Sequence, residues 1–472
     1  MEINFLSFLM AMKFEAMITL VVFFLLIIKI EGRAGTAFVV QSTNILLLLS
    51  FVLGFVGNGS SEIFSGMFRT TPLIAFEKNI LLFATLIISL TSYSWAKNHK
   101  HVSEFYILML SSLLGMFFMI SSSNLLMFYL GLELSTIPVA ALCNFDLEKR
   151  ISSEAALKMI LSSAFSSGIL LFGISMIYGT TGSLDFKIIS ETMVGSTLQL
   201  FAFILIFTGF AFKLSVVPFH LWTADVYEGS PVAITAFLSV VSKGSMAFVF
   251  ITTLYRVFGS MGDMWYKMLA LTAVITIITG NLFALRQTNL KRFMAFSSIA
   301  QVGYLLIGVS GISALGVTSV VYFIMIYVFS NLAAFGVISV ISAFTGKENI
   351  QDFKGLYASN PALALVMAIA LFSLAGIPPT AGFFGKLFLL TAGAKQSNWT
   401  LIIIASLNLI ISLYYYLRIV RAMFIEKTDE PIEKINFSIN EMIAFVVCVV
   451  GILSLGFIKG FFEAIFSLSD KF

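Results

Sequence analysis

Six titratable side chains stand in stretches of the sequence that are otherwise almost wholly apolar, and their chemistry is that of proton transfer. They are Glu133, Lys158, Lys213, His220, Lys243 and Lys386. Burying a charge is costly unless the group is paired or hydrated, or changes its protonation. Carboxylate, amine and imidazole groups all bind and release protons. We therefore interpret the six residues as a water-linked proton path.

Two of these residues lie beside breaks in the expected helices. In GFAFKLSVVPFHLW, residues 209–222, Pro218 lacks a backbone N–H and interrupts any helix around it. In SLAGIPPTAGFFGK, residues 373–386, Pro378 and Pro379 stand among glycines. Such breaks free backbone groups that recruit water, and water beside a lysine allows that lysine to exchange protons.

The composition indicates which solvent surrounds these residues. The chain has 472 residues, of which 59% are hydrophobic and 11% are charged. Soluble proteins carry roughly 25% charged residues. We therefore predict an all-α polytopic membrane protein with about 14 spanning helices of about 20 residues each. The spans are expected near 5–28, 36–57, 73–95, 104–121, 124–143, 155–178, 198–222, 231–256, 266–285, 293–311, 315–344, 361–392, 398–424 and 438–467.

The sequence argues against several classes of functional site. The chain has no long soluble insertion and no glycine-rich phosphate loop. Its two cysteines, Cys143 and Cys448, lie far apart in apolar runs, which argues against a disulfide framework or a thiolate metal site. We expect no metal and no cofactor in this chain. The net charge of +4 fits lysine and arginine in cytoplasmic loops rather than a nucleic-acid surface.

The two interrupted spans, the seventh and the twelfth, are five spans apart. A unit of five helices would place them at matching positions, and its odd number would invert the second copy. Paired interrupted helices of this kind mark transport paths. We predict two inverted five-helix repeats, spans 4–8 and 9–13. The expected divisions are a three-helix flank at 1–100, the repeats at 101–258 and 259–427, and a C-terminal helix at 428–472.

Each candidate residue also has a structural interpretation. Lys213 lies about 20 Å and Lys243 about 18 Å along its span, at 1.5 Å per residue, so both are expected near the middle of the membrane. Either Lys213 or Glu133 could instead belong to a structural ion pair. Lys158 follows Glu154 by four residues, which is the spacing of an ordinary helix surface pair. His220 alone could be a structural residue at a helix end.

Loop charges predict the orientation of the chain. With the N-terminus outside, fifteen basic residues fall in the inner loops and eight on the outer side, and we counted Lys78 among the eight. Lysine and arginine favour the cytoplasmic side, so both termini are expected on the outer side. Lys13 is close enough to the N-terminus to reach the surface, and we assign it no role.

Long stretches of the chain resemble the antiporter-like membrane subunits of respiratory complex I, the NADH:quinone oxidoreductases. They are GLELSTIPVAAL, EAALKMILSSAFSSGILLFG, GFAFKLSVVPFHLWTADVYEGSPVAITAFLSVVSKG, NLKRFMAFSSIAQVGYLLIG and SLAGIPPTAGFFGK. The likeness extends from about residue 100 to 425. It implies that the six candidate residues transfer protons.

The resemblance also implies the setting of the chain. FMN, iron–sulfur clusters and quinone would belong to partner subunits, and the partners would be other antiporter-like and quinone-site subunits in a bacterial inner membrane. Two alternatives stay open: a subunit of a multi-subunit sodium/proton antiporter, and a stand-alone solute transporter. The first would be encoded among antiporter genes without electron-input subunits. The second predicts polar or aromatic substrate groups at the breaks, where we find mainly lysine, histidine and proline.

Overall fold

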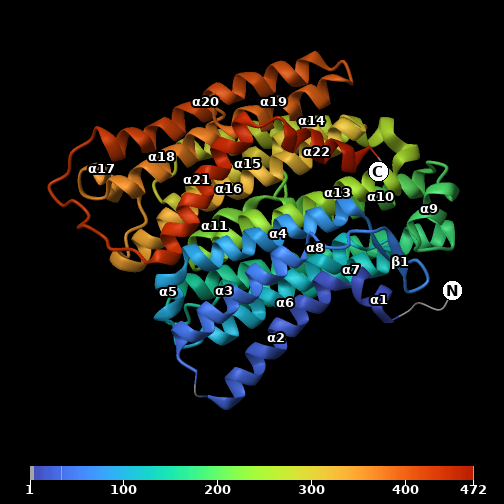
Figure 1. Ribbon diagram of the computed structural model, residues 1–472. Helices are drawn as coiled ribbons and strands as arrows, with labels where there is room; N and C mark the ends of the chain where they lie inside the picture. Colours follow the sequence, from blue (N-terminus) through green and yellow to red (C-terminus); the bar gives the residue numbers. More distant parts are fainter. Residues whose placement is uncertain (1–4, 33, 471–472) are drawn as a thin grey trace. The chain divides into compact units, whose positions relative to one another are not determined.

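A computed structural model describes residues 5–32 and 34–470 of the chain, and nearly all of its regular structure is helical. In this described part, twelve helices are long and apolar enough to cross a membrane. The strands are a short antiparallel hairpin of β1 (Ser61–Ile63) and β2 (Phe68–Thr70). Figure 1 shows the helices in chain order. The expected all-α membrane fold is confirmed.

The chain forms two compact units. The first contains residues up to 86, 99–214 and 241–265. Its helices, counting α4 here although its end passes into the second unit, are α1 (Phe5–Ala11), α2 (Lys13–Glu31), α3 (Thr36–Leu53), α4 (Pro72–Thr91), α6 (Val102–Ile120), α7 (Leu125–Cys143), α8 (Arg150–Thr181), α9 (Phe186–Thr192), α10 (Thr197–Leu214) and α13 (Lys243–Arg256), followed by a 3₁₀ turn at Gly259–Met261.

The second unit contains residues 87–98, 215–240 and those from 266 onward. Its helices, counting α14 here although its start lies in the first unit, are α5 (Tyr93–Lys97), α11 (Leu221–Gly229), α12 (Val232–Phe237), α14 (Gly262–Leu285), α15 (Leu290–Val309), α16 (Ala314–Thr345), α17 (Leu356–Ser359), α18 (Pro361–Ala375), α19 (Ala381–Ala394), α20 (Trp399–Phe424), α21 (Ile439–Phe457) and α22 (Gly460–Ser469). A π-helical turn, Leu238–Ser242, lies at the boundary between the units, and a 3₁₀ turn covers Ile350–Phe353.

Each of the fourteen expected spans coincides with one helix or with consecutive helices. The expected span at 198–222 is divided into α10 and α11, and the one at 361–392 into α18 and α19. Both divisions fall at the predicted proline-containing breaks, because proline removes a donor from the helical hydrogen-bond ladder.

Local features recur at a constant spacing along the chain. The helices α8 and α16 each have 32 residues and begin at Arg150 and Ala314, 164 positions apart. Each ends on a left-handed glycine, Gly182 and Gly346, again 164 positions apart. A duplicated five-helix unit would give this spacing. The inverted relation of the two copies stays a prediction.

The first unit packs most closely between α6 and α7. A Cβ on Gly115 would lie 2.4 Å from the backbone nitrogen of Ser135, and one on Gly131 would lie 2.7 Å from that of Met119. Small residues allow helices in a membrane to approach in this way. The Ser112 hydroxyl donates to the Ser135 carbonyl oxygen at 2.7 Å, which fixes the position of α7.

One expectation about the loops is wrong. Lys78, which we counted on the outer side, lies inside α4, and only 1% of it is exposed. It forms an ion pair with Glu15 of α2. Lys13, which was given no role, donates to the Gly54 carbonyl oxygen at 3.0 Å and to the Asn58 side-chain oxygen at 2.6 Å. It therefore ties the start of α2 to the end of α3.

Candidate functional site

Lys213 and Glu133 come together in the first unit. Lys213 lies in the last turn of α10 and is 9% exposed, and its ammonium group donates to the Thr136 hydroxyl of α7 at 2.5 Å. Glu133 stands one turn before Thr136 and interacts electrostatically with Lys213. Among the described residues, Oε1 of Glu133 has no hydrogen-bond partner. This carboxylate therefore has an oxygen available to water or to a moving proton.

Hydroxyl side chains form hydrogen bonds within the first break, and one of them accepts from its backbone. After α10 ends, Ser215 adopts a positive φ of 65° and the chain turns until His220, which caps α11 and is 8% exposed. Thr223 donates to the Ser215 hydroxyl at 2.7 Å, and the Val217 N–H donates to the Thr276 hydroxyl at 3.1 Å. Irregular backbone at membrane depth is tolerated where protein groups satisfy it in this way.

Lys243 follows a second kind of helix distortion. The π-helical turn Leu238–Ser242 connects α12 to α13, and Lys243 is the first residue of α13. It is 5% exposed. Single π turns inside helices are frequent at functional sites. The sequence predicted a helix start near Pro231, and α12 begins at the next residue, but the π turn has no signal in the residue types.

Lys386 is held by the backbone of the second break. It lies in α19, and its ammonium group donates to the Leu374 carbonyl oxygen at 2.6 Å and to that of Ala375 at 3.4 Å. These two carbonyls end α18, where a helix leaves its last acceptors unused and carries partial negative charge. The ammonium group also lies 5.2 Å from the centre of the Tyr304 ring. The side chain is 2% exposed.

A polar network that sequence reasoning missed surrounds Lys386. Gln301 of α15 donates to the Leu374 carbonyl oxygen and to the Tyr416 hydroxyl, both at 3.2 Å. The Tyr416 hydroxyl in turn bonds to the Ser297 hydroxyl. Lys386 and Gln301 therefore share one acceptor, and a chain of exchangeable hydrogens leads from it to Ser297. Gln301 lies in the quoted stretch NLKRFMAFSSIAQVGYLLIG, so its polarity within an apolar run was the available signal.

Lys158 is placed differently from the other lysines. It forms an ion pair with Glu154 at 2.7 Å, and 41% of the lysine side chain and 59% of the glutamate side chain are exposed. The i, i+4 surface pair that the sequence suggested is present. The relay role of Lys158 stays a prediction.

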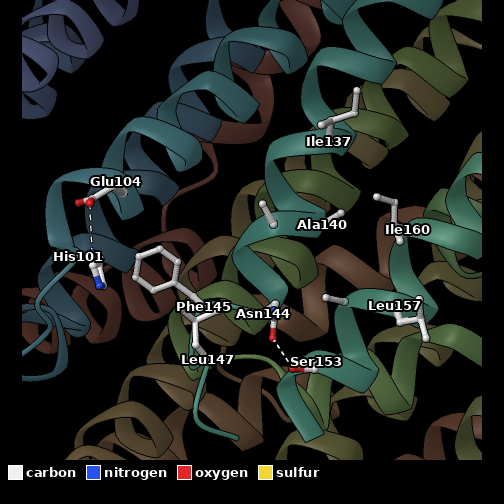
Figure 2. A pocket seen from close by; sticks show the side chains of 12 residues that line it. His101, Glu104, Ile137, Ala140, Asn144, Phe145, Leu147, Ser153, Leu157 and Ile160 are labelled. Atoms are coloured by element: carbon white, nitrogen blue, oxygen red, sulfur yellow. Dashed lines mark hydrogen bonds and ion pairs between the residues drawn. The ribbon is translucent and has the colours of Figure 1, made fainter. Parts of the chain in front are cut away.

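A pocket of about 640 Å³ opens beside α7 and α8, and none of the six candidate proton-transfer residues lines it. Figure 2 shows it between the ends of α7 and α8, with apolar side chains such as Ile137 and Leu157 along it. Its polar edge carries two hydrogen bonds, His101 to Glu104 at 3.2 Å and Ser153 to Asn144 at 2.9 Å. Four of the candidates are instead buried among the helices: Lys213, His220, Lys243 and Lys386.

An arginine anchors the helix that follows the first break. Arg292, near the start of α15, bonds to Asp225 and Glu228 of α11 at 2.7 Å each. Beside it Lys291 pairs with Glu348 at 2.9 Å and donates to the Ser230 carbonyl oxygen at 3.1 Å. Sequence reasoning treated the two basic residues as loop charges. The contacts show that they hold α11 in place.

Comparison with protein families identifies the family to which this arrangement of helices belongs. Residues 122–412 match the model of the membrane-spanning region of NADH:quinone oxidoreductases and Mrp antiporters. The chain belongs to this family. The matched region contains both breaks and all six candidate residues.

Relatives within the family narrow the assignment to the subunit N group. The chain is 50% identical over 406 residues to the NADH-quinone oxidoreductase subunit N of Phocaeicola vulgatus, covering 85% of this chain and 86% of that one. It is 36% identical over 435 residues to subunit N of Moorella thermoacetica, covering 91% of each. The chain is accordingly an antiporter-like membrane subunit of the complex I type.

Solved structures support the same fold. A chain of respiratory complex I from Thermus thermophilus is 27% identical, with a TM-score of 0.81, and the match covers 95% of this chain and 97% of that one. A chain of the Mrp complex from Dietzia superposes with a TM-score of 0.83 at 18% identity, which shows the fold alone.

Proposed function

We propose that this subunit moves protons across the membrane while partner subunits carry out quinone reduction. The observation that carries the proposal is the placement of Lys213 and Lys386. Each is buried next to the last turn of the helix segment that precedes a break. A lysine at membrane depth is costly to bury, and one that no carboxylate neutralises in an ion pair is a candidate for an ion or proton route.

Each proposed proton carrier has a distinct part. Glu133 supplies a negative charge that interacts with Lys213, and His220 carries protons past the first break. Lys243 continues the path from the start of α13, and Lys386 passes protons to water on the far side. Lys158 delivers protons from the exposed start of α8. Water completes the connections between these groups.

The setting of this path follows from the relatives. We infer a bacterial inner membrane with both termini on the outer side, and a translocase in which this chain carries no redox centre. FMN, iron–sulfur clusters and quinone sit in partner subunits. The names of the relatives, NADH-quinone oxidoreductase subunit N, support this inference.

A second function, sodium/proton exchange, is suggested by the matched family model, which includes Mrp antiporters as well as NADH:quinone oxidoreductases. In the sodium alternative, vesicles that hold the intact complex would reduce no quinone, and added sodium would dissipate a proton gradient imposed across them. In the proton alternative, quinone reduction would acidify the vesicles equally with sodium or with potassium. Identifying the proteins that purify with this chain separates the two assemblies independently.

The deciding experiment measures proton uptake into such vesicles during quinone reduction. Lys386→Met removes the amine and keeps an unbranched apolar side chain. We expect the complex to assemble and proton uptake to be lost. The matched control is Lys395→Met at the C-cap of the same helix, because Lys395 is exposed. Normal uptake in an assembled Lys386→Met complex would overturn the proposal.

A further inference from the structure

A second cluster of buried charges lies in the first unit and contains none of the residues at the breaks. We call it the flank cluster: Glu15 of α2, Glu77, Lys78 and Asn79 of α4, and Arg256 at the end of α13. Glu15, Glu77 and Asn79 are each 3% exposed or less, and Lys78 is 1% exposed. The proton path described above uses none of them.

Lys78 and Glu15 neutralise one another within this cluster. Their side chains form a buried ion pair. The rings of Phe14, Phe68 and Phe117 lie 5.9, 5.0 and 5.8 Å from the lysine ammonium group. An aromatic enclosure stabilises a cation and keeps water from its sides. The charge of Lys78 is therefore already compensated.

Glu77 is different, because its carboxyl group is left incompletely bonded. It is 2% exposed, and its Oε1 has no hydrogen-bond partner among the described residues. The same holds for both amide atoms of Asn79 and for Oε2 of Glu15. An unsatisfied buried polar group costs about 1–3 kcal/mol. Four such atoms in one cluster indicate internal water, which bonds to polar groups that protein leaves unsatisfied.

Charged groups connect Glu77 to the surface. Arg256 is partly buried and interacts electrostatically with Glu77 and also with Arg69 and Glu62. Arg69 and Glu62 face each other at 3.7 Å on the β1–β2 hairpin, where 35% and 61% of their side chains are exposed. Glu77 itself lies only about 8 Å along α4, at 1.5 Å per residue from Pro72.

We propose that Glu77 is an exchangeable proton-binding site of the N-terminal flank, reached by water from the hairpin surface past Arg256. A hydronium ion entering at the hairpin gives its proton to the Glu77 carboxylate and leaves as water, and the reverse step releases the proton. The ionised carboxylate balances Arg256, whereas the protonated one leaves that cation without its inner counter-charge. Lys78, paired with Glu15, is the other charge that interacts with Glu77, and Lys13 interacts in turn with Lys78.

Chemical labelling of the unmodified complex tests this site and does not depend on the proton path through the breaks. Dicyclohexylcarbodiimide is an apolar reagent that adds a protonated carboxyl group across its C=N bond, and the product rearranges to an N-acylurea that mass spectrometry locates. We expect an adduct on Glu77 at acidic pH and its loss at alkaline pH. Absence of the adduct at every pH, or an adduct formed equally at every pH, would overturn the proposal.

Three variants sharpen the result. Glu77→Gln should lose the adduct in an assembled complex, whereas Glu62→Gln at the exposed hairpin should keep it with an unchanged pH profile. Arg256→Met removes the neighbouring cation and should shift the pH range in which Glu77 is labelled. An Arg256→Met complex that labels with the original profile would contradict the route past Arg256. If Glu77→Gln fails to assemble, the pH profile of the unmodified complex still decides the question.

Discussion

The two broken helices hold their lysines by different means. At the first break, the ammonium group of Lys213 bonds to a side-chain hydroxyl, that of Thr136, and senses the carboxylate of Glu133. At the second break, the ammonium group of Lys386 bonds to two backbone carbonyls and lies near the Tyr304 ring. No carboxylate among the described residues forms an ion pair with Lys386.

This difference separates a variable environment from a fixed one. The charge of Glu133 changes whenever that carboxylate gains or loses a proton, so the surroundings of Lys213 can be switched. The carbonyl dipoles at the end of α18 keep the same partial charge in every state. We therefore expect proton transfer at Lys213 to depend on the charge of Glu133. We expect proton transfer at Lys386 to depend only on the arrival of protons.

The largest expected effect is at Lys386, because no neighbouring side chain can replace its amine. Lys386→Met should lower proton uptake by about tenfold or more. This corresponds to an activation free energy of the rate-limiting step that is higher by roughly 1.4 kcal/mol or more. The measurement is vesicle acidification per quinone reduced. Lys395→Met should pump normally. An assembled Lys386→Met complex that retains half of its uptake would show that the second break does not carry the path.

Lys243 tests whether the central lysine is a proton carrier or only a buried cation. Arginine keeps the charge but does not release its proton near neutral pH, and alanine removes the charge. If Lys243 relays protons, both Lys243→Arg and Lys243→Ala complexes should assemble and show uptake several-fold lower. If it is a structural cation, Lys243→Arg should pump normally and Lys243→Ala should lose assembly.

Glu133→Gln tests the first break, where a side chain supplies the negative charge near Lys213. It removes the charge near Lys213 and keeps the shape of the side chain, so proton uptake should fall several-fold while assembly persists. Glu133→Asp should have a smaller effect, because it retains the charge at a shorter reach. Glu148→Gln, at an exposed position in the turn between α7 and α8, is the matched control. Equal uptake by Glu133→Gln and the unmodified complex would remove the distinction between the two breaks.

Thr136→Val should give the smallest effect. It keeps the shape of the side chain and removes the hydroxyl that accepts from Lys213. The loss of one hydrogen bond to a charged group is worth about 1.5–3 kcal/mol, part of which water recovers at a hydrated site. We expect about a twofold fall in uptake, measured at the same quinone-reduction rate. A Thr136→Val complex as inactive as Glu133→Gln would mean that geometry, rather than charge, governs Lys213.

The helices and breaks were predictable from the sequence because each has a local cause. Apolar length defines the spans, and Pro218, Pro378 and Pro379 define the breaks. Lys78 was misplaced because its partner, Glu15, is 63 residues away and no local pattern links the two. A lysine near the end of a span therefore resembles a loop charge until the tertiary contact is seen.

The polar network near Lys386 was missed for a different reason. Gln301 and Tyr416 are uncharged, so they cost little inside an apolar run and do not stand out as the lysines do. The acceptors of Lys386 are backbone carbonyls, which every residue possesses. The π turn before Lys243 is likewise a property of the folded helix. The sequence could show which residues need an explanation but not which atoms satisfy them.

The backbone acceptors of Lys386 have a consequence for mutational tolerance. A substitution at Leu374 or Ala375 changes a side chain and leaves the carbonyl oxygen in place. We therefore expect substitutions at these two positions to be tolerated. The sensitive positions at the second break are instead two glycines. Gly376 has a φ of 85°, and a Cβ on Gly382 would lie 1.7 Å from the Ser373 carbonyl oxygen. A random-mutagenesis screen for loss of proton uptake should therefore recover substitutions at these glycines more often than at the residues whose oxygens bind the lysine.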